Sequence, residues 1–283
     1  MYQWRLLWLF MKYFLKKMYN KIAIIAAKNN SQAINIKNSL VNKYNFFDLS
    51  NDHSKIENID LIIAIGGDGL ILHLLHEFEN NPIPIYGVNC GTVGFLMNSY
   101  HEENFLEYVH KAQISTVHPL KMDVIDTENK IYSHIAINEV ALFRQTNQAA
   151  KINIQINDKE RIECLVSDGI LVATSAGSTA YNLSVGGPII PFGAEIIALT
   201  PISPFRPRRW TGALISDKST IKFEIIEFNK RPVSAVADSQ EIRNIRSVEI
   251  FLDFSIQKQL LFDKDNNLQE RVFKEQFYRD IIY

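Results

Sequence analysis

The first 118 residues alternate between two kinds of hydrophobic pattern. Three short runs are continuously apolar, as in strands buried on both faces, and they occupy residues 22–27, 60–65 and 83–88. The segments that follow these runs have apolar residues at helical spacing, at residues 30–44, 70–78 and 102–111. Strands and helices that alternate in this way predict a parallel α/β sheet with both faces covered.

The pattern changes near Pro119, where strands begin to dominate. Apolar stretches of strand length occupy residues 122–125, 131–143, 152–156, 161–166, 170–174, 196–199, 221–226, 233–237, 248–252 and 260–262. Residues 152–156 alternate strictly between apolar and polar, which indicates a strand with one solvated face. Short strands at this spacing predict an antiparallel, β-sandwich-like domain. A last helical pattern lies at residues 268–278.

Composition and charge narrow the function classes. The chain has 283 residues, 47% of them hydrophobic, so it can bury the cores of about two domains without disulfides. Residues 1–21 contain five basic residues and no acidic one, which leaves 25 bases and 31 acids in the remainder. A body with this acidic excess argues against a protein that coats nucleic acid. Cys90 and Cys164 form no CxxC pair, which favours reduced thiols in a cytoplasmic protein.

The N-terminal residues 1–17 form a basic, apolar extension. Their apolar stretch is too short and too interrupted to span a bilayer, so we expect no stable membrane insertion. No small-residue cleavage site follows it, which argues against a signal peptide. Two interpretations remain, a helix lying at a membrane surface or a translation start at Met11 or Met18, and the second is favoured because the foldable pattern begins only at Lys21.

Four residues after the second apolar run carry the most chemical information, Gly66-Gly67-Asp68-Gly69. Ligands of open α/β sheets bind beyond the carboxyl ends of the strands. Glycines at such a position let the backbone approach a phosphate, and an aspartate among them can accept a proton or hold Mg²⁺. The stretch lacks the Gly-Lys-Ser/Thr ending of a Walker A loop, and by itself it fits a tight turn equally well.

Two further groups of polar residues interrupt the β pattern. Asn138-Glu139 breaks an apolar strand and would need partners if buried. Ser167-Asp168-Gly169 is followed by a segment rich in glycine and hydroxyl residues, Gly177-Ser178-Thr179-Ala180-Tyr181-Asn182. Side chains and backbone of these small residues can contact a ligand, and Tyr181 can stack on it or hydrogen-bond to it.

Taken together, these residues resemble the NAD kinase family. The resemblance runs from about Lys21 to the C-terminal region and rests on several motifs in family order. They are Gly66 to Gly69, Gly87-Val88-Asn89 with Gly91 to Leu96, Asn138-Glu139, Ser167 to Thr174, Gly177 to Tyr181, Ser184 to Pro188 and Asp238-Ser239-Gln240. Residues 199–207 are similar to the version found in some bacterial members.

The resemblance implies a reaction in which NAD and ATP, or inorganic polyphosphate, give NADP. Asp68 would take the proton of the 2′-hydroxyl of the adenosine ribose, and a divalent cation, by expectation Mg²⁺, would neutralise the donor phosphates. The sequence shows no set of protein ligands for a metal. The family also implies a homo-oligomer, a dimer or a tetramer.

The resemblance assigns binding residues to each substrate. The NAD-binding residues are Asp68, Gly69, Asn138, Glu139, Asp168, Ala176, Thr179, Ala180, Tyr181, Asn182, Leu183, Ser184 and Gln240. Possible contacts to the ATP phosphates are Gly66, Gly67 and His73. The resemblance also implies an N-terminal Rossmann-like α/β domain at residues 18–118, to which residues 264–283 return, and a β-rich domain at residues 119–263.

The chain departs from the family pattern at three positions. Leu70 stands where threonine is common, and Val166 stands where some members have a charged residue. Ala149 replaces a basic or histidine contact for which neighbouring Lys151 can substitute. The first difference concerns the ATP side, and the other two concern the preference between NAD and NADH.

Two other function classes compete with the NAD kinase interpretation. A lipid kinase of the diacylglycerol or sphingosine type also carries a Gly-Gly-Asp-Gly motif, but Asn138-Glu139 and residues 177–181 fit a dinucleotide better. The third hypothesis is an NAD-binding regulator without activity. Two clusters keep open interpretations: His73 with His76 could bind phosphate or metal or face solvent, and Arg206, Arg208 and Arg209 could meet phosphate, a second subunit or solvent.

Overall fold

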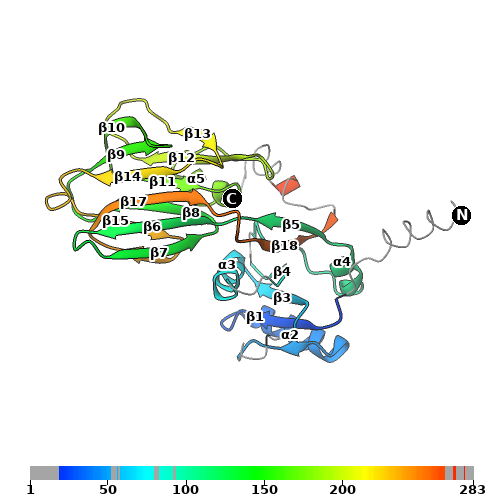
Figure 1. Cartoon of the computed structure of the whole chain (residues 1–283). Helices are drawn as coiled ribbons and strands as arrows, with labels where there is room; N and C mark the ends of the chain where they lie inside the picture. The colour runs from blue at the N-terminus through cyan, green and yellow to red at the C-terminus, as the bar shows by residue number, and fades with distance from the viewer. Residues whose placement is uncertain are drawn as a thin grey trace, which may run out of the picture. The chain divides into compact units, whose positions relative to one another are not determined.

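The computed structural model describes residues 19–51, 56, 58–79, 83–91, 94–264, 270–271 and 277. The chain divides into two units (Figure 1). Unit 1 comprises the chain up to Thr116 and the return Gln259–Leu268, and unit 2 comprises Val117–Lys258 and Gln269–Tyr283. The N-terminal extension and most of the predicted late helix lie outside the described residues.

Unit 1 is a six-stranded sheet with helices on both faces, in the strand order β2-β1-β3-β4-β18-β5. Its elements are β1 (Ile22–Ala26), α2 (Ser31–Tyr44), β2 (Phe47–Asp48), β3 (Leu61–Gly66), α3 (Asp68–Glu77), β4 (Ile85–Asn89), α4 (Phe105–Lys111), β5 (Gln113–Val117) and β18 (Lys258–Phe262). The strands from β2 to β18 in this order are all parallel to their neighbours. The predicted parallel α/β architecture is thus confirmed.

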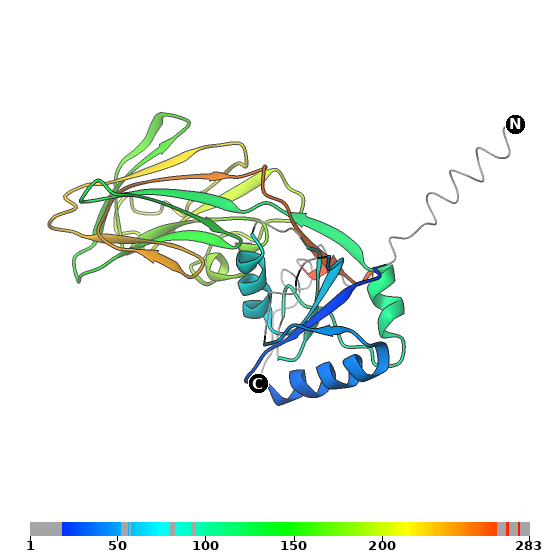
Figure 2. The ribbon, with the colours of Figure 1, turned by 60° about the horizontal axis from the view of Figure 1, so that its bottom comes forward.

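The sequence pattern explains how the helices pack on this sheet. Ala33, Ile36 and Leu40 of α2 are buried together with Phe105 and Val109 of α4 in one apolar cluster. Alternate strand residues face the other side, where α3 packs; Figure 2 shows α2 and α3 on opposite sides of the strands. Asn30 caps the start of α2, because its side chain accepts a hydrogen bond from the Ala33 N–H. Asn45 caps its end in a left-handed conformation.

Unit 2 consists of two six-stranded sheets, ordered β10-β9-β14-β17-β6-β7 and β13-β12-β11-β8-β15-β16, and every recorded strand pair in them is antiparallel. The elements in the first half are β6 (Leu120–Asp126), β7 (Ile131–Ala136), β8 (Glu139–Arg144), β9 (Ala150–Ile156), β10 (Lys159–Ser167), β11 (Gly169–Ala173), η2 (Gly177–Thr179) and α5 (Tyr181–Ser184). Those in the second half are β12 (Ile196–Ile202), β13 (Ala213–Ser216), β14 (Ile221–Ile225), β15 (Val233–Ala237), β16 (Gln240–Ile242) and β17 (Ile245–Leu252). One apolar core takes residues from both sheets, which confirms the predicted sandwich.

The prediction of one strand over residues 131–143 was wrong. The chain forms β7 in the first sheet, bends at Ile137 and Asn138, and continues as β8 in the second sheet. The same change of sheet occurs at Asp168, between β10 and β11. The apolar pattern continues through both bends because both strands face the same core, so periodicity alone cannot reveal them.

The chain returns from unit 2 to unit 1 through β18, which pairs with β4. The return to unit 1 spans Gln259–Leu268, and the described residues after it, Glu270, Arg271 and Phe277, are grouped with unit 2. The return expected over residues 264–283 stays a prediction. Among the described residues, no helix has the length and apolar character needed to cross a membrane.

Candidate functional site

Asp68 lies where β3 ends and α3 begins, at the carboxyl edge of the parallel sheet of unit 1. Its carboxylate accepts two backbone hydrogen bonds: Oδ2 from the Phe95 N–H at 2.7 Å and Oδ1 from the Leu96 N–H at 2.9 Å. Bonds to a charged acceptor are stronger than neutral ones, and two of them fix the plane of the carboxylate. The predicted catalytic residue is therefore held rigidly at a half-buried position.

The glycines around Asp68 leave room on one side of the loop. Apart from its immediate neighbours in the chain, a Cβ atom built on Gly67 or on Gly69 would meet no atom of the described residues within 4 Å. Gly66 is tighter: its carbonyl accepts a hydrogen bond from the Cys90 N–H at 2.8 Å, which ties the loop to the end of β4. The backbone around Gly67 and Gly69 is thus accessible to a ligand of phosphate size.

His73 lies on the exposed face of α3. Its Nε2 atom is 3.6 Å from Oε2 of Glu77, and its side chain is 70% exposed. The described residues contain no cluster of three or more His, Cys, Asp or Glu side chains that could hold a metal ion.

In unit 2, a carboxylate fixes the bend at Asn138. Asp238 accepts hydrogen bonds from the backbone N–H groups of Ile137 at 2.7 Å, Asn138 at 3.0 Å and Glu139 at 3.3 Å. These N–H groups belong to the bend where the chain leaves one sheet for the other. Asp238 stands in one of the motifs that resemble the family, but no role was predicted for it. The sequence signal for it was an aspartate directly after an apolar strand, a residue type that is common in turns. In the structure Asp238 has the left-handed backbone conformation of a turn residue.

Glu139 is a buried carboxyl group next to this clamp. Burial, and then the negative charge of Asp238, raise the pKa of Glu139 from its ordinary 4.5 to about 7. Its Oε2 atom is buried and has no hydrogen-bond partner among the described residues. A buried carboxyl oxygen without a partner is suited to accept a hydrogen bond from a ligand.

The segment after β11 packs directly on the Asn138 bend. A Cβ atom on Gly177 would lie 2.2 Å from the backbone oxygen of Asn138, so only glycine allows this approach. Thr174 joins the two segments, because its hydroxyl donates to the Ile137 carbonyl at 2.7 Å and accepts from the Gly177 N–H at 3.0 Å. Residues 176–184 are therefore placed beside Asn138 and Glu139.

Two residues of that segment differ in what their side chains do. Asn182 is fully buried; its amide donates to the carbonyls of Ser178 and Pro188 and accepts from the Thr200 hydroxyl at 2.7 Å. Its side chain thus stabilises the segment, and its predicted contact with NAD stays a prediction. Tyr181 packs at 5.9 Å from the Phe143 ring, and burial, followed by the charges of Glu139 and Asp168, raises the pKa of its hydroxyl.

The other residues of this segment that were predicted to bind NAD differ in how far they are exposed to solvent. Ala176 is buried, Thr179, Ala180 and Leu183 are half-buried, and Ser184 is exposed. Gln240 is exposed at the start of β16, close in sequence to the Asp238 clamp.

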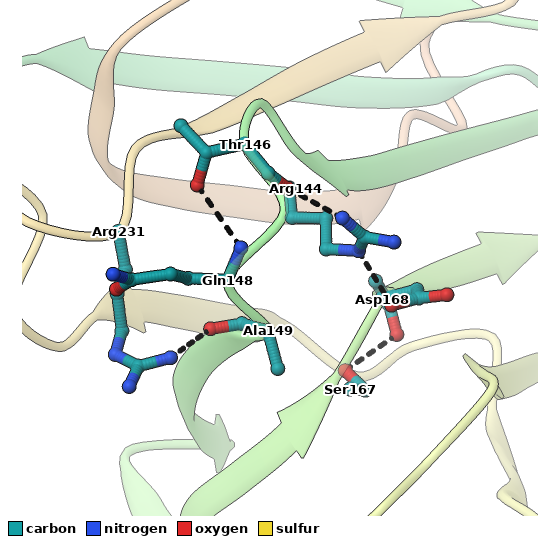
Figure 3. A network of polar contacts seen from close by, with 8 residues as sticks. Arg144, Thr146, Gln148, Ala149, Ser167, Asp168 and Arg231 are labelled. Atoms are coloured by element: carbon teal, nitrogen blue, oxygen red, sulfur yellow. Dashed lines mark hydrogen bonds and ion pairs between the residues drawn. The ribbon is translucent and has the colours of Figure 1, made fainter.

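Asp168 forms an ion pair that the sequence analysis missed (Figure 3). Nε of Arg144 lies 2.5 Å from Oδ1 of Asp168, and the same guanidinium reaches the Thr146 carbonyl. Arg144 stands at the end of β8, next to β11 in the sheet, which explains the contact. No local pattern marks this pair, because the partners come from different strands.

The structure shows the contacts of the basic residues near position 149 and of the arginines at 206 and 208. Lys151, expected as a substitute at position 149, pairs with Glu227 at 2.7 Å. The Ala149 carbonyl accepts a hydrogen bond from Arg231, as Figure 3 shows. Arg206 and Arg208 are exposed and lie over the ring of Phe205 at 5.6 and 5.8 Å.

Comparisons with known proteins agree with these motifs. Residues 8–112 match the ATP-NAD kinase N-terminal domain, and residues 137–251 match the ATP-NAD kinase C-terminal domain. The NAD kinase of Rickettsia felis is 49% identical over 258 residues, which cover 91% of this chain and 98% of that protein. The chain belongs to the NAD kinase family. The NAD kinase of Rickettsia prowazekii is 48% identical over the same length.

Solved structures of the family share the fold. An NAD kinase from Archaeoglobus fulgidus in complex with ATP superposes with a TM-score of 0.73 at 23% identity, covering 90% of this chain and 98% of that one. Yeast NADH kinase complexed with NADH gives a TM-score of 0.77 at 19% identity, covering 94% and 91%. Membership of the NAD kinase family makes the chain a phosphotransferase and disfavours the lipid kinase alternative.

Proposed function

We propose that this chain transfers the γ-phosphoryl group of ATP to the 2′-hydroxyl of the adenosine ribose of NAD, giving NADP and ADP. The observation that carries the proposal is the carboxylate of Asp68, fixed by two backbone N–H groups at the carboxyl edge of a parallel sheet. Inorganic polyphosphate remains an alternative donor, which the experiment below distinguishes.

Asp68 acts as the general base in this proposal. The bonds from the Phe95 and Leu96 N–H groups hold its carboxylate in one orientation. The carboxylate takes the proton of the 2′-hydroxyl while the new O–P bond forms and the bond from the γ-phosphorus to the bridging oxygen breaks. The accessible backbone at Gly67 and Gly69, with Gly66, receives the phosphates, and His73 is a further candidate contact.

Mg²⁺ bound to the donor phosphates would neutralise part of their charge during transfer. The chain fits this arrangement because it offers the Asp68 carboxylate and no dense ligand cluster among the described residues. Positioning and electrostatics then supply most of the catalysis.

Unit 2 supplies the binding of NAD in this proposal. Glu139 offers a buried oxygen for a ribose hydroxyl, and Asn138 is presented by the bend that Asp238 holds. Tyr181 lies close enough to Glu139 and to Asp168 for burial and then these two charges to raise the pKa of its hydroxyl. The remaining contacts come from Ala176, Thr179, Ala180, Leu183, Ser184 and Gln240, and Asn182 holds their segment in place.

We also propose that the protein is a cytoplasmic homo-oligomer. In this proposal it does not bind nucleic acid and does not insert stably in membranes. Its support is the acidic charge of the chain after residue 21 and the resemblance of its motifs to a family of dimers and tetramers. Light scattering coupled to size-exclusion chromatography measures the subunit number, and a monomer would contradict this part.

The deciding experiment mixes the purified chain with NAD, ATP and Mg²⁺ and follows NADP with an NADP-specific dehydrogenase. Parallel reactions replace ATP with polyphosphate, NAD with NADH, and NAD with diacylglycerol or sphingosine. NADP formation supports the proposal. Phosphorylation of a lipid without NADP would overturn it in favour of the lipid kinase, and NAD binding without any transfer would favour the regulator.

A further inference from the structure

The segment that holds Asp68 has little secondary structure of its own. Phe95 and Leu96 donate the two hydrogen bonds to the carboxylate, but they lie in a turn between β4 and α4. A turn of this kind keeps its N–H groups in place only if something anchors it. Its anchor is the residue two positions after Leu96.

Asn98 is fully buried and joins the segment to two strands. Its side-chain amide donates to the Gly87 carbonyl of β4 at 3.0 Å and to the Leu261 carbonyl of β18 at 2.9 Å. Its Oδ1 atom accepts from the Asp263 N–H at 3.0 Å. The backbone of Asn98 also bonds to Gly87 and Asn89, both at 2.8 Å.

The fit against β4 leaves no space for the segment to shift inward. A Cβ atom on Gly87 would lie 3.1 Å from the Leu96 carbonyl oxygen and 2.5 Å from Sδ of Met97. The backbone of Leu96 thus rests on the bare backbone of the strand, and Asn98 keeps it there.

The second anchor, β18, is more than a hundred residues away in sequence. Asp263, just after this strand, is itself buried and accepts a hydrogen bond from the Tyr86 hydroxyl at 2.7 Å. The returning strand is therefore fixed to β4 both by its backbone and by this side-chain pair.

We propose that Asn98 is a positioning residue for Asp68, through which the returning strand β18 sets the direction of the Phe95 and Leu96 N–H groups. The proposal rests on the proposed role of Asp68 as the base. Displacement of a reacting group by about 1 Å costs roughly a hundredfold in rate. Loss of the Asn98 side chain should therefore lower kcat and leave substrate binding nearly unchanged.

The test is a double-mutant cycle between positions 98 and 68. Asn98→Ala should lower kcat by roughly 10- to 100-fold, with changes below about threefold in the KM for NAD and for ATP. In the Asp68→Asn background the same substitution should cause no further loss, because the group that it positions is already gone. Equal losses in both backgrounds, or an unchanged kcat, would overturn the proposal.

A matched control separates positioning from loss of stability. Asn153 is also buried and its amide also donates two hydrogen bonds, but in unit 2, to Glu160 and the Glu163 carbonyl. Asn153→Ala should lower the melting temperature and leave kcat within about threefold. If Asn98→Ala fails to fold, Asn98→Ser, which keeps one donor, and Gly87→Ala, which displaces Leu96 directly, enter the same cycle.

The outcome is distinguishable from failure of the proposed function. If the unmodified chain makes no NADP, the function itself is wrong. If the chain makes NADP, Asp68→Asn abolishes it, and Asn98→Ala retains full kcat, only the positioning role of Asn98 is wrong.

Discussion

The two units use the same interaction in opposite directions. In unit 1 the backbone holds a carboxylate: N–H groups of Phe95 and Leu96 fix the side chain of Asp68. In unit 2 a carboxylate holds the backbone: Asp238 fixes the N–H groups of residues 137–139. The first arrangement fixes the side chain that we propose as the base, and the second fixes the bend that we propose as part of the NAD site. Changes in unit 1 should therefore affect kcat, and changes in unit 2 should affect the binding of NAD.

The largest expected effect tests the unit 1 half of this comparison. Asp68→Asn removes the base but keeps the size of the side chain, so kcat should fall by about 10²- to 10⁴-fold. The dissociation constant for NAD, measured by calorimetry, should change much less.

The control for that substitution is Asp48→Asn. Asp48 also accepts a backbone N–H, from Ser50 at 3.0 Å, but lies on β2 and pairs with Lys37. Full activity is expected for it. Wild-type turnover by Asp68→Asn would remove Asp68 from the mechanism.

Glu139 gives the next largest effect, on stability and not on rate. Its pKa is about 7 in the folded chain and 4.5 ordinarily, so below pH 4.5 it is protonated in both states and costs nothing. Between pH 4.5 and 7 only the unfolded chain releases the proton, so the free energy of unfolding falls as pH rises. Above pH 7 the ionised Glu139 lowers the free energy of unfolding by its full amount, about 3 kcal/mol. Glu139→Gln should therefore gain stability over the unmodified chain as pH rises from 4.5 to 7.

Denaturant unfolding at several pH values measures this difference. Glu249→Gln, exposed on β17, should track the unmodified chain throughout. If the free energy of unfolding changes with pH in the same way for Glu139→Gln and for the unmodified chain, then ionisation of Glu139 does not destabilise the folded state.

Asp238→Asn tests the unit 2 half of the comparison. It removes the charge from three hydrogen bonds to the Asn138 bend, each of which is worth about 1.5–3 kcal/mol in its charged form. If the substitution costs NAD binding the free energy of one such hydrogen bond, the dissociation constant for NAD should rise by about 10- to 100-fold. The kcat at saturating NAD should change less. The loss of the neighbouring negative charge should also lower the pKa of Glu139.

The matched control is Asp126→Asn, because Asp126 also accepts two backbone N–H groups in unit 2, from Glu128 and Lys130. Its loss should reduce stability and leave NAD affinity intact. Equal weakening of NAD binding by both substitutions would show that general destabilisation, and not the bend, is responsible.

The smallest effect concerns His73. The side chain is largely exposed and its pair with Glu77 is worth little, so His73→Ala should barely change stability. If the imidazole contacts the donor phosphates, the KM for ATP should rise about two- to fivefold, the effect of one exposed charge contact. Glu77→Gln removes the pair without the imidazole, and an unchanged KM for ATP in His73→Ala would exclude the contact.

The elements that sequence could predict are those whose signal is local. The apolar runs of β1, β3 and β4 and the helical spacing of α2 follow from residues close together in the chain. The bends at Asn138 and Asp168 were not predictable, because the core-facing periodicity continues through them. The two-residue strand β2 was missed because it is too short to show a pattern.

The same distinction applies to the candidate site. Asp68 and Asn138-Glu139 stand out because polar residues interrupt apolar runs. Arg144 and Asn98 do not stand out, because their roles come from partners that the fold brings together, Asp168 on another strand and Leu261 on the returning one. The raised pKa of Glu139 likewise comes from burial in the fold and then from the charge of Asp238, about a hundred residues later in the chain.

The path of the chain has a consequence for the order in which the protein can form during synthesis. All strands of the two sheets of unit 2 lie between Leu120 and Leu252, so this unit can close as soon as that stretch has left the ribosome. The sheet of unit 1 starts at the other end of the chain but lacks a central strand until β18 emerges. Strand β18 joins the sheet of unit 1 only after every strand in the two sheets of unit 2 has been synthesised. Only then can the side chain of Asn98 form its hydrogen bond to the Leu261 carbonyl. A nascent chain therefore forms the strands around the Asp238 clamp before it completes the sheet that carries Asp68.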